Sequence, residues 1–359
     1  MVRWLIWLAI KVSLFGRMRR LAKTNPNISD LSFSVVIPAF NAENTLAACL
    51  DSIIQCTEKT SEIIVVDDAS TDRTAQIAAS YPCHLVQNET NLGPGGTRNK
   101  GAQLVTGDWI VFIDSDVCIE PDTFEKIRAY IARHPEISSV SATYSAICPV
   151  NGFISKYKNH YLNQSFCWLS ERVGFANTSL MAIKKQVFQQ FGGFADEWKA
   201  AEDTIFGAEL ALSGHSLFVA KEICVQHMKQ LTLARLLKDD FQRSYEMAKF
   251  LWTKMDKLPF MIRHCIGHHH SMGLMLRVPL SYLIFFLIIA FAFFPSSYMV
   301  AATGAVSALF LALMGPFLFR LAKAEGLGFT LLVIPLHWIE MLVGGAAVFI
   351  AFFAHRTKR

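Results

Sequence analysis

Two hydrophobic patterns divide the chain. From Phe33 to about Ala220, short β-branched runs alternate with amphipathic helical stretches, whereas after Met272 the apolar residues form long segments. Strands that are continuous in apolar character and separated by such helices predict an α/β domain whose mostly parallel sheet is covered on both faces. Ligands bind such sheets beyond the carboxyl ends of the strands. We therefore expect a ligand site along one edge of the first domain.

The expected strands of this domain read SVVIPAF, EIIVVDD, CHLVQN, WIVFID and ISSVSATYSA, in that order. Apolar residues at helical spacing predict one helix from Ala42 and another after Thr71. Polar residues collect where several of these strands end, so the pattern places the candidate chemistry at the predicted edge.

The second half of the chain has the character of membrane helices. Three apolar segments, at about 278–294, 298–319 and 329–354, are each near the roughly 20 residues that span hydrocarbon. Three crossings from a cytoplasmic first domain would leave the basic tail outside, against the positive-inside tendency. The third segment contains His337, Glu340 and the Gly344 and Gly345 pair, and buried ionisable groups are costly in lipid. Either two or three crossings are compatible with the sequence, and the third segment is the candidate that does not cross.

The net charge of +5 has a local origin. Six basic residues precede the first acidic residue, so the remainder of the chain sums to about −1, which argues against a nucleic-acid partner. Residues 1–30 predict a basic amphipathic helix at an anionic membrane surface. A signal peptide is the alternative, although the small-residue cleavage pattern is missing. The eight cysteines show no metal-site or disulfide spacing, which favours a reducing compartment.

The segment FIDSDV contains the strongest candidate for chemistry. Asp114 and Asp116 end an apolar strand, and residues two apart on a strand point the same way. Hard oxygen ligands in this position suit Mg²⁺ or Mn²⁺ bridging a diphosphate. A solvated turn is the alternative for an isolated DxD motif.

Two neighbouring strand ends extend this cluster. In VVDDASTD, Asp68 can accept an N–H from a nucleotide base, while Pro38 and Phe40 of VIPAFNAEN offer a wall for the ring. Asp67 and Asp68 are equally suited to capping a helix or forming a turn.

Two further motifs carry charge. Arg98 in NLGPGGTRNKG can approach and neutralise phosphate, although the motif also fits an ordinary loop entering a helix. In AAEDTIFGAEL, Glu202 and Asp203 precede an amphipathic helix, where a carboxylate stays ionised as a general base must. Asp203 equally fits an N-cap. The group His268, His269 and His270 near His264 is interpreted as an interfacial cluster rather than a metal site.

The order of these motifs from Phe33 to about His227 resembles the family 2 glycosyltransferases of GT-A fold, a Rossmann-like α/β architecture. The resemblance covers about 200 residues and includes NTSLMAIKKQVFQQFGGFAD before EDTIFG. It implies roles for matching residues only. Asp203 would be the base of an inverting displacement, Asp116 and His227 would bind the metal, and the nucleotide-sugar site would contain Pro38, Phe40, Glu43, Asp68, Arg98, Asp114 and Glu202.

The resemblance implies a metal-dependent enzyme, with Mg²⁺ or Mn²⁺, that takes one sugar from a UDP- or GDP-sugar. The QxxRW element of processive synthases is absent after Asp203, which favours single transfers. A lipid or lipid-linked acceptor at the cytoplasmic face of the cell inner membrane is expected, as in glycolipid or cell-envelope polysaccharide synthesis. Residues 150–175, rich in aromatics and amides, are expected either to recognise the acceptor or to form a loop on the membrane.

The predicted domains are 1–30, a membrane-surface helix; 31–230, the GT-A domain; 231–271, an interfacial helical connector; and 272–359, a multi-pass transmembrane region. Three alternatives stand beside this interpretation. The acceptor can be a polyprenyl phosphate, the protein can be a scaffold that binds without turnover, or it can be a nucleotidyltransferase. The last should have a Gly-rich loop after its first strand, where VIPAFNAEN stands instead.

Overall fold

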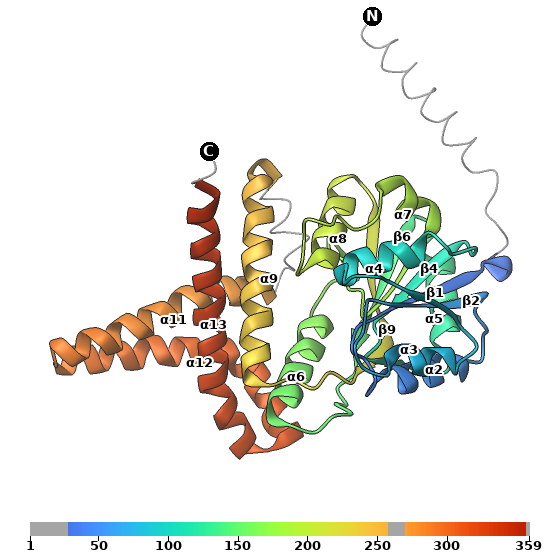
Figure 1. Ribbon diagram of the computed structural model, residues 1–359. Helices are drawn as coiled ribbons and strands as arrows, with labels where there is room; N and C mark the ends of the chain where they lie inside the picture. Colours follow the sequence, from blue (N-terminus) through green and yellow to red (C-terminus); the bar gives the residue numbers. More distant parts are fainter. Residues whose placement is uncertain (1–27, 258–269, 357–359) are drawn as a thin grey trace, which may run out of the picture.

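A nine-stranded sheet forms the centre of the first domain in the computed structural model, which describes residues 28–257 and 270–356 (Figure 1). The strands lie in the order β3-β2-β1-β4-β8-β6-β9-β5, and β7 pairs with β9. Their bounds are β1 Phe33–Ala39, β2 Glu62–Asp67, β3 His84–Gln87, β4 Trp109–Ile113, β5 Val117–Ile119, β6 Ile137–Tyr144, β7 Arg172–Val173, β8 Leu180–Lys184 and β9 Ser216–His227.

The sheet has a parallel half and a mixed half. Strands β1, β2, β3 and β4 are all parallel, and Ala39 lies opposite Asp67 at their carboxyl ends. In the other half, β8 is antiparallel to both β4 and β6, β5 and β7 are antiparallel to β9, and β6 and β9 are parallel. The α/β fold with a sheet covered by helices is confirmed, while the antiparallel pairs go beyond the expected pattern because they depend on long connections rather than on local periodicity.

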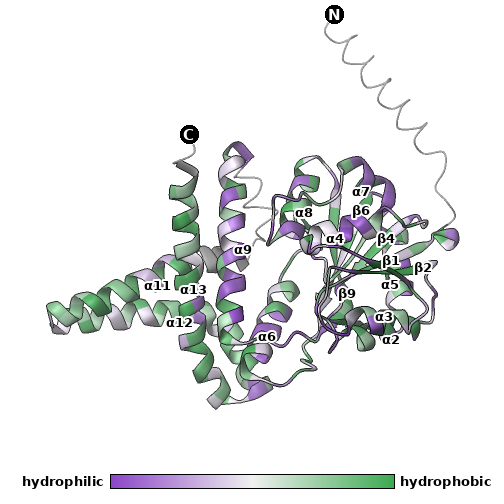
Figure 2. Ribbon diagram, in the orientation of Figure 1, coloured by the Kyte–Doolittle hydropathy of each residue, from purple (hydrophilic) through white to green (hydrophobic). Residues whose placement is uncertain are grey.

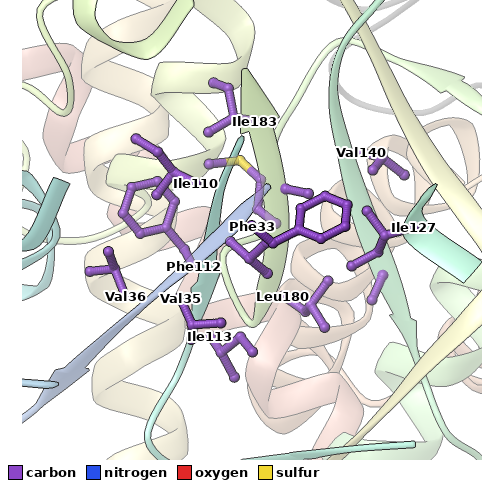
Figure 3. Packing of buried hydrophobic residues seen from close by; sticks show 14 of the residues in the cluster. Phe33, Val35, Val36, Ile110, Phe112, Ile113, Ile127, Val140, Leu180 and Ile183 are labelled. Atoms are coloured by element: carbon purple, nitrogen blue, oxygen red, sulfur yellow. The ribbon is translucent and has the colours of Figure 1, made fainter. Parts of the chain in front are cut away.

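Helices cover both faces of the sheet, so consecutive residues of the central strands are buried. Val35, Val36 and Ile37 of β1 are all fully buried. Figure 3 shows Val35 and Val36 in one cluster with Ile110 and Phe112 of β4. The helices of this domain are α2 Leu46–Ile54, α3 Thr74–Ala79, α4 Gly93–Ala102, α5 Thr123–Arg133, α6 Phe153–Cys167, α7 Lys185–Phe191 and α8 Glu202–Leu212, and a 3-10 turn, η1, spans Ile28–Asp30.

Helix α8 depends on one glycine for its close approach to the chain before β8. A β-carbon on Gly207 would lie 2.0 Å from the backbone nitrogen of Ala176. Because backbone cannot yield as a flexible side chain does, only glycine permits this packing. The contact sets the position of the first turn of α8, which contains Glu202 and Asp203.

Three helices at the end of the chain are long and apolar enough to cross a membrane. They are α11 His270–Phe293, α12 Ser297–Glu325 and α13 Leu327–Arg356. In Figure 1, α11 and α12 project together from the body, whereas α13 runs across their base and alongside α9 Leu233–Thr253. Figure 2 shows α11 and α12 hydrophobic along most of their length and α9 mixed in character. The predicted helical connector before the apolar segments is thus a helix packed on α13, followed by a 3-10 turn, η2, at Met255–Lys257.

The ionisable side chains of α13 are paired inside the protein. Tyr157 of α6 contacts Glu340, and its hydroxyl lies 2.8 Å from His337 Nδ1. Arg277 of α11 lies 2.8 Å from Nε2 of the same imidazole, and Lys158 Nζ lies 3.2 Å from Glu340. These contacts tie α13 to the first domain and remove the cost of exposing the charges to lipid.

Several expectations fall outside the described residues, or nearly so. Residues 1–27 of the predicted N-terminal helix lie outside the described residues, as do His264, His268 and His269. The seven cysteines that the structure describes are all free thiols. Residues 150–175 form α6 for most of their length, so the expectation of a simple loop on the membrane is wrong.

Candidate active site

A cavity of about 460 Å³ lies beyond the carboxyl ends of β1, β2 and β4. This is the edge that the strand pattern predicts, because parallel neighbours end together. The structure brings seven predicted residues to its walls, from motifs spread over more than 160 positions. These residues are Pro38, Phe40, Asp68, Arg98, Asp114, Asp116 and Glu202.

The DxD motif lies in the turn between β4 and β5. Asp114 accepts a hydrogen bond from Arg98 at 2.6 Å, while Asp116 Oδ1 lies 3.2 Å from His227 Nε2. Antiparallel pairing of Val117 with His227 explains the second contact, because it brings the end of β9 beside the motif. Burial raises the pKa of Asp114. Burial alone would also raise the pKa of Asp116, but His227 and Lys229 lower it below the ordinary value.

Asp116 and His227 are the side chains best placed to hold a divalent metal. Within the described part of the chain, no group of three or more His, Cys, Asp or Glu side chains forms a ready-made metal site. Mg²⁺ and Mn²⁺ sites in phosphate-handling enzymes commonly use one or two protein ligands, with water and phosphate oxygens completing the shell. The pair therefore fits a metal that binds together with a diphosphate.

Arg98 is the centre of a buried ion-pair triad. Its side chain is only 4% exposed, and it donates to Glu202 at 2.8 Å and to Asp114 at 2.6 Å. The two carboxylates already balance its charge, so a free cation for phosphate is not what the structure presents. Arg98 instead joins α4, the end of β4 and the start of α8, and so positions three walls of the cavity.

Asp68 combines the two roles that the sequence leaves open. Its carboxylate accepts hydrogen bonds from the backbone N–H of Leu92 at 2.8 Å and of Gly93 at 2.9 Å, and from Asn88 Nδ2 at 2.7 Å. It therefore fixes the start of α4 while it also lines the cavity. Nearby, Phe40 is half exposed and its ring is free to contact a ligand.

Backbone strain gathers around the same cavity. Three non-glycine residues have left-handed φ values: Asn41 at 50°, Ala69 at 60° and Ala201 at 61°. Each lies next to, or among, the residues of the cavity wall. Such conformations cost of order 1–3 kcal/mol each and concentrate at ligand sites.

Three predicted residues are not part of this cavity wall: His227, which lines a neighbouring chamber, and Glu43 and Asp203. Glu43 pairs with Arg73, Nε to Oε2 at 3.2 Å, and helps to join the loop after β1 to the turn before α3. Asp203 is buried and accepts hydrogen bonds from the backbone N–H and hydroxyl of Thr178, both at 3.3 Å. Ala201 is the N-cap of α8, so the alternative of Asp203 as the N-cap is wrong.

A second chamber of about 140 Å³ adjoins the DxD motif and contains residues that sequence reasoning missed. Tyr144 lines it, with its hydroxyl 2.7 Å from Ser179 and 3.0 Å from Asn177, and burial raises the pKa of Tyr144 to about 12. Helix α9 closes the neighbouring cavity with polar residues one or two turns apart. This polar stripe is visible in the sequence and could have indicated that α9 faces the site. Its residues are Arg235, Asp239, Gln242 and Arg243.

A charged group on the far side of this chamber makes a pH-dependent contribution to stability. Lys158 donates to Asp240 at 2.8 Å and to Glu340 at 3.2 Å. Burial raises the pKa of Asp240 to about 6, with Lys158 opposing and Glu340 adding to the shift. A raised carboxyl pKa means that the folded state favours the protonated form. The protonated carboxyl of Asp240 therefore stabilises the folded state fully below about pH 4, and this stabilisation is lost as the pH rises through 6.

Asp240→Asn should remove this pH dependence. A shift of about two units corresponds to at most roughly 3 kcal/mol, or about 5–10 °C in Tm for a domain of this size. The measurement is thermal unfolding of detergent-solubilised protein. We expect the difference in Tm, variant minus unmodified protein, to increase by several degrees between pH 4 and pH 7, because only the unmodified protein loses stability over this range. Asp196→Asn, at an exposed position, serves as the control. A constant difference across this range would contradict the assignment.

Comparison with known proteins agrees with this geometry. Residues 34–192 match the family described as glycosyl transferase family 2. An uncharacterized glycosyltransferase of Haemophilus influenzae is 30% identical over 188 residues, 48% of this chain and 60% of the relative. The amylovoran biosynthesis glycosyltransferase AmsB of Erwinia amylovora is 40% identical over 113 residues, 30% of this chain and 38% of the relative. The chain thus spans less than two thirds of the length of these relatives.

A solved structure shares the fold over almost the whole chain. The mannosyltransferase PcManGT from Pyrobaculum calidifontis, solved with GDP-Man and Mn²⁺, has a TM-score of 0.54 and 18% identity, with 96% of each chain covered. Identity at this level shows the fold alone. The sequence match and the arrangement of the strand-end motifs together identify residues 34–192 as a glycosyltransferase domain of family 2, built on a GT-A fold.

Proposed function

We propose that the protein transfers a single sugar from a nucleotide-sugar to a lipid or lipid-linked acceptor at the cytoplasmic face of a membrane, with inversion and with a divalent metal. The observation that carries the proposal is the convergence of Asp68, Asp114 and Asp116 on one cavity at the end of the parallel strands. The cavity volume of about 460 Å³ falls in the range of small-molecule sites. GDP-Man and Mn²⁺ bound to the structural neighbour support the ligand classes.

The side chains of the cavity support distinct tasks. Phe40 and Pro38 form a wall for the nucleotide base, and the loop fixed by Asp68 lines the same cavity. Asp116 and His227 would hold the metal, which when bound offsets the charge that develops on the nucleoside diphosphate leaving group. The Arg98 triad keeps Asp114 and Glu202 in place around the donor.

The membrane helices support placement of this site at a bilayer surface. Large apolar side chains, including Phe286, Phe293 and Phe319, are exposed on α11 and α12, as expected of helices that contact lipid. Helix α13 runs across these two and is bound to the first domain through Glu340. We propose that α11 and α12 cross the membrane and that α13 lies near the interface, which keeps both the first domain and the basic tail on the cytoplasmic side.

The transfer itself is tested with purified full-length protein in detergent. A panel of radiolabelled UDP- and GDP-sugars is incubated with the protein and a membrane lipid extract, with and without Mn²⁺. Metal-dependent release of nucleoside diphosphate, with the label appearing in the lipid fraction, is the expected result. Binding without metal-dependent release would instead support a scaffold.

Asp203→Asn tests whether the acceptor reacts through a hydroxyl group. Asp203 lies in the first turn of α8, directly after Glu202 of the cavity wall, and we propose that its carboxylate takes the proton of an attacking hydroxyl. Loss of this base is expected to lower kcat by roughly 100-fold or more, with little change in the KM of the donor. Thr204→Val, which alters the adjacent contact to Asp203 but keeps the carboxylate, is the control. Activity within about tenfold of the unmodified enzyme would point to an acceptor that is already ionised, such as a polyprenyl phosphate.

A further inference from the structure

A large apolar cavity of about 1010 Å³ lies between α6, α9, α11 and α13. Its walls are built from aromatic and aliphatic side chains of α11, α13 and the end of α9. Polar groups gather where α6 meets the middle of α9, so the cavity has an apolar body and a charged end. The apolar wall includes Trp252, Val278, Tyr282, Phe286, Phe349 and Phe352.

The charged end of this cavity leads to the candidate active site. Lys158 and Asp240 line both the apolar cavity and the chamber beside Asp116. Arg243 of α9 lines these two spaces and also the cavity of about 460 Å³ that we assign to the nucleotide-sugar, called here the donor cavity. A single guanidinium is therefore shared by the apolar cavity and the place where the sugar would be transferred.

Arg243 differs from the neighbouring cations in its pairing. Lys158 is bound to Asp240 and Glu340, and Arg235 is bound to Asp239 at 2.8 Å. Among the residues that the structure describes, no carboxylate lies within ion-pair distance of Arg243, and its side chain is exposed to the cavities. Burial would lower the pKa of Arg243, but the more distant carboxylates of Asp203, Glu202 and Asp240 raise it, so the guanidinium is held as a cation whose N–H groups are not taken up by an ion pair.

We propose that the apolar cavity holds the hydrocarbon chain of the acceptor lipid and that Arg243 binds the phosphate joining this chain to the polar head. The proposal rests on the proposed glycosyltransferase function and adds the acceptor class. A planar guanidinium binds phosphate oxygens through paired, charge-assisted hydrogen bonds. The cavity is bordered by α11, which we propose crosses the membrane. A hydrocarbon chain can therefore enter it from the bilayer while the attached phosphate stays beside Arg243 at the polar end.

Binding of a short amphiphile tests the two parts of this site separately. The full-length protein in detergent is titrated with radiolabelled farnesyl phosphate and with farnesol, which has the same chain but no phosphate. We expect farnesyl phosphate to bind at least about tenfold more tightly than farnesol. Arg243→Gln should reduce this preference to about threefold or less, because the charge-assisted contacts with the phosphate are lost. Lys238→Gln, which removes an exposed positive charge from the same helix, should leave the preference unchanged.

The chain site is tested by a substitution in the cavity wall. Ala346 of α13 lines the cavity, and Ala346→Phe should weaken binding of both farnesyl phosphate and farnesol by about tenfold. Ala305→Phe, at an exposed position on α12, is the matched control. Trp252 also lines the cavity and allows a test without a substitution in the wall. A brominated hydrocarbon chain bound in the cavity should quench its fluorescence. The Trp252→Phe variant identifies the share of the fluorescence that comes from Trp252.

The outcomes separate this proposal from the transferase function. An unchanged preference in Arg243→Gln, or equal binding of farnesyl phosphate and farnesol, would overturn the phosphate site. Undiminished binding in a folded Ala346→Phe protein, or no quenching of Trp252, would overturn the chain site. Metal-dependent release of nucleoside diphosphate, measured on the same preparations without a lipid acceptor, reports on the donor site alone. The acceptor proposal can thus fail while donor cleavage persists.

Discussion

Replacement of Asp116 by Asn is expected to lower kcat/KM for sugar transfer by about 1000-fold, equivalent to roughly 4 kcal/mol of transition-state stabilisation. Asn keeps the size of the side chain but removes the negative charge that a divalent metal requires. In the structure, Asp116 pairs with His227 at 3.2 Å and lines the cavity that we assign to the donor. Release of nucleoside diphosphate is measured over a range of Mn²⁺ concentrations, since a weakened metal site should also raise the Mn²⁺ concentration for half-maximal rate.

The control for this prediction is Asp122→Asn. Asp122 lies six residues further along, is half exposed and pairs with Lys126, so its loss should leave activity within about twofold. The Tm of both variants should stay within a few degrees of the unmodified protein. If Asp116→Asn retained more than a tenth of the activity with the same Mn²⁺ dependence, Asp116 would not be a metal ligand.

Arg98→Met is expected to have the largest effect on stability, about 3–5 kcal/mol. The substitution leaves the carboxylates of Asp114 and Glu202 buried without their cation, while Met fills much of the space. For a domain of this size, we expect Tm to fall by roughly 10 °C in thermal unfolding of the detergent-solubilised protein. Activity should fall with it, because Asp114 and Glu202 line the donor cavity.

Arg73→Met is the matched control, because Arg73 also pairs with a carboxylate but its side chain is 74% exposed. An exposed ion pair contributes about 0–1 kcal/mol, so Tm should change by no more than a few degrees. The double variant Arg98→Met with Glu202→Gln removes one of the orphaned charges and should recover part of the loss. Equal Tm changes for Arg98→Met and Arg73→Met would show that the triad does not hold the site together.

The predicted site residues differ in how far the local sequence determines their positions. Asp68, Asp114 and Asp116 follow hydrophobic strands, and parallel strands end at one edge, so their convergence could be predicted from local patterns. Glu43 is also a carboxylate that follows a strand of the parallel half, β1, yet it turns toward Arg73. Proximity to a strand end does not specify the rotamer or the partner of a side chain in a loop.

Arg243 shows the opposite case, since its segment was predicted as a helix but not as part of the site. Its role depends on how α9 lies across the donor cavity and along α13. Likewise, His337 and Glu340 are unexpected within an apolar segment, and tertiary contacts explain them: both meet Tyr157, about 180 residues away, and they also pair with Arg277 and Lys158.

The sequence by itself determined the α/β domain, the apolar helices, and the strand-end acids, because hydrophobic periodicity and chain direction are local properties. Tertiary structure alone decided the antiparallel half of the sheet, the pairing of Asp116 with His227, and the course of α13 across α11 and α12. It also decided that Arg98 is held in two direct ion pairs, while Arg243 faces the cavities with carboxylates only at longer range. These features depend on which distant segments meet, and the free energy of such contacts has no signature in the spacing of residues along the chain.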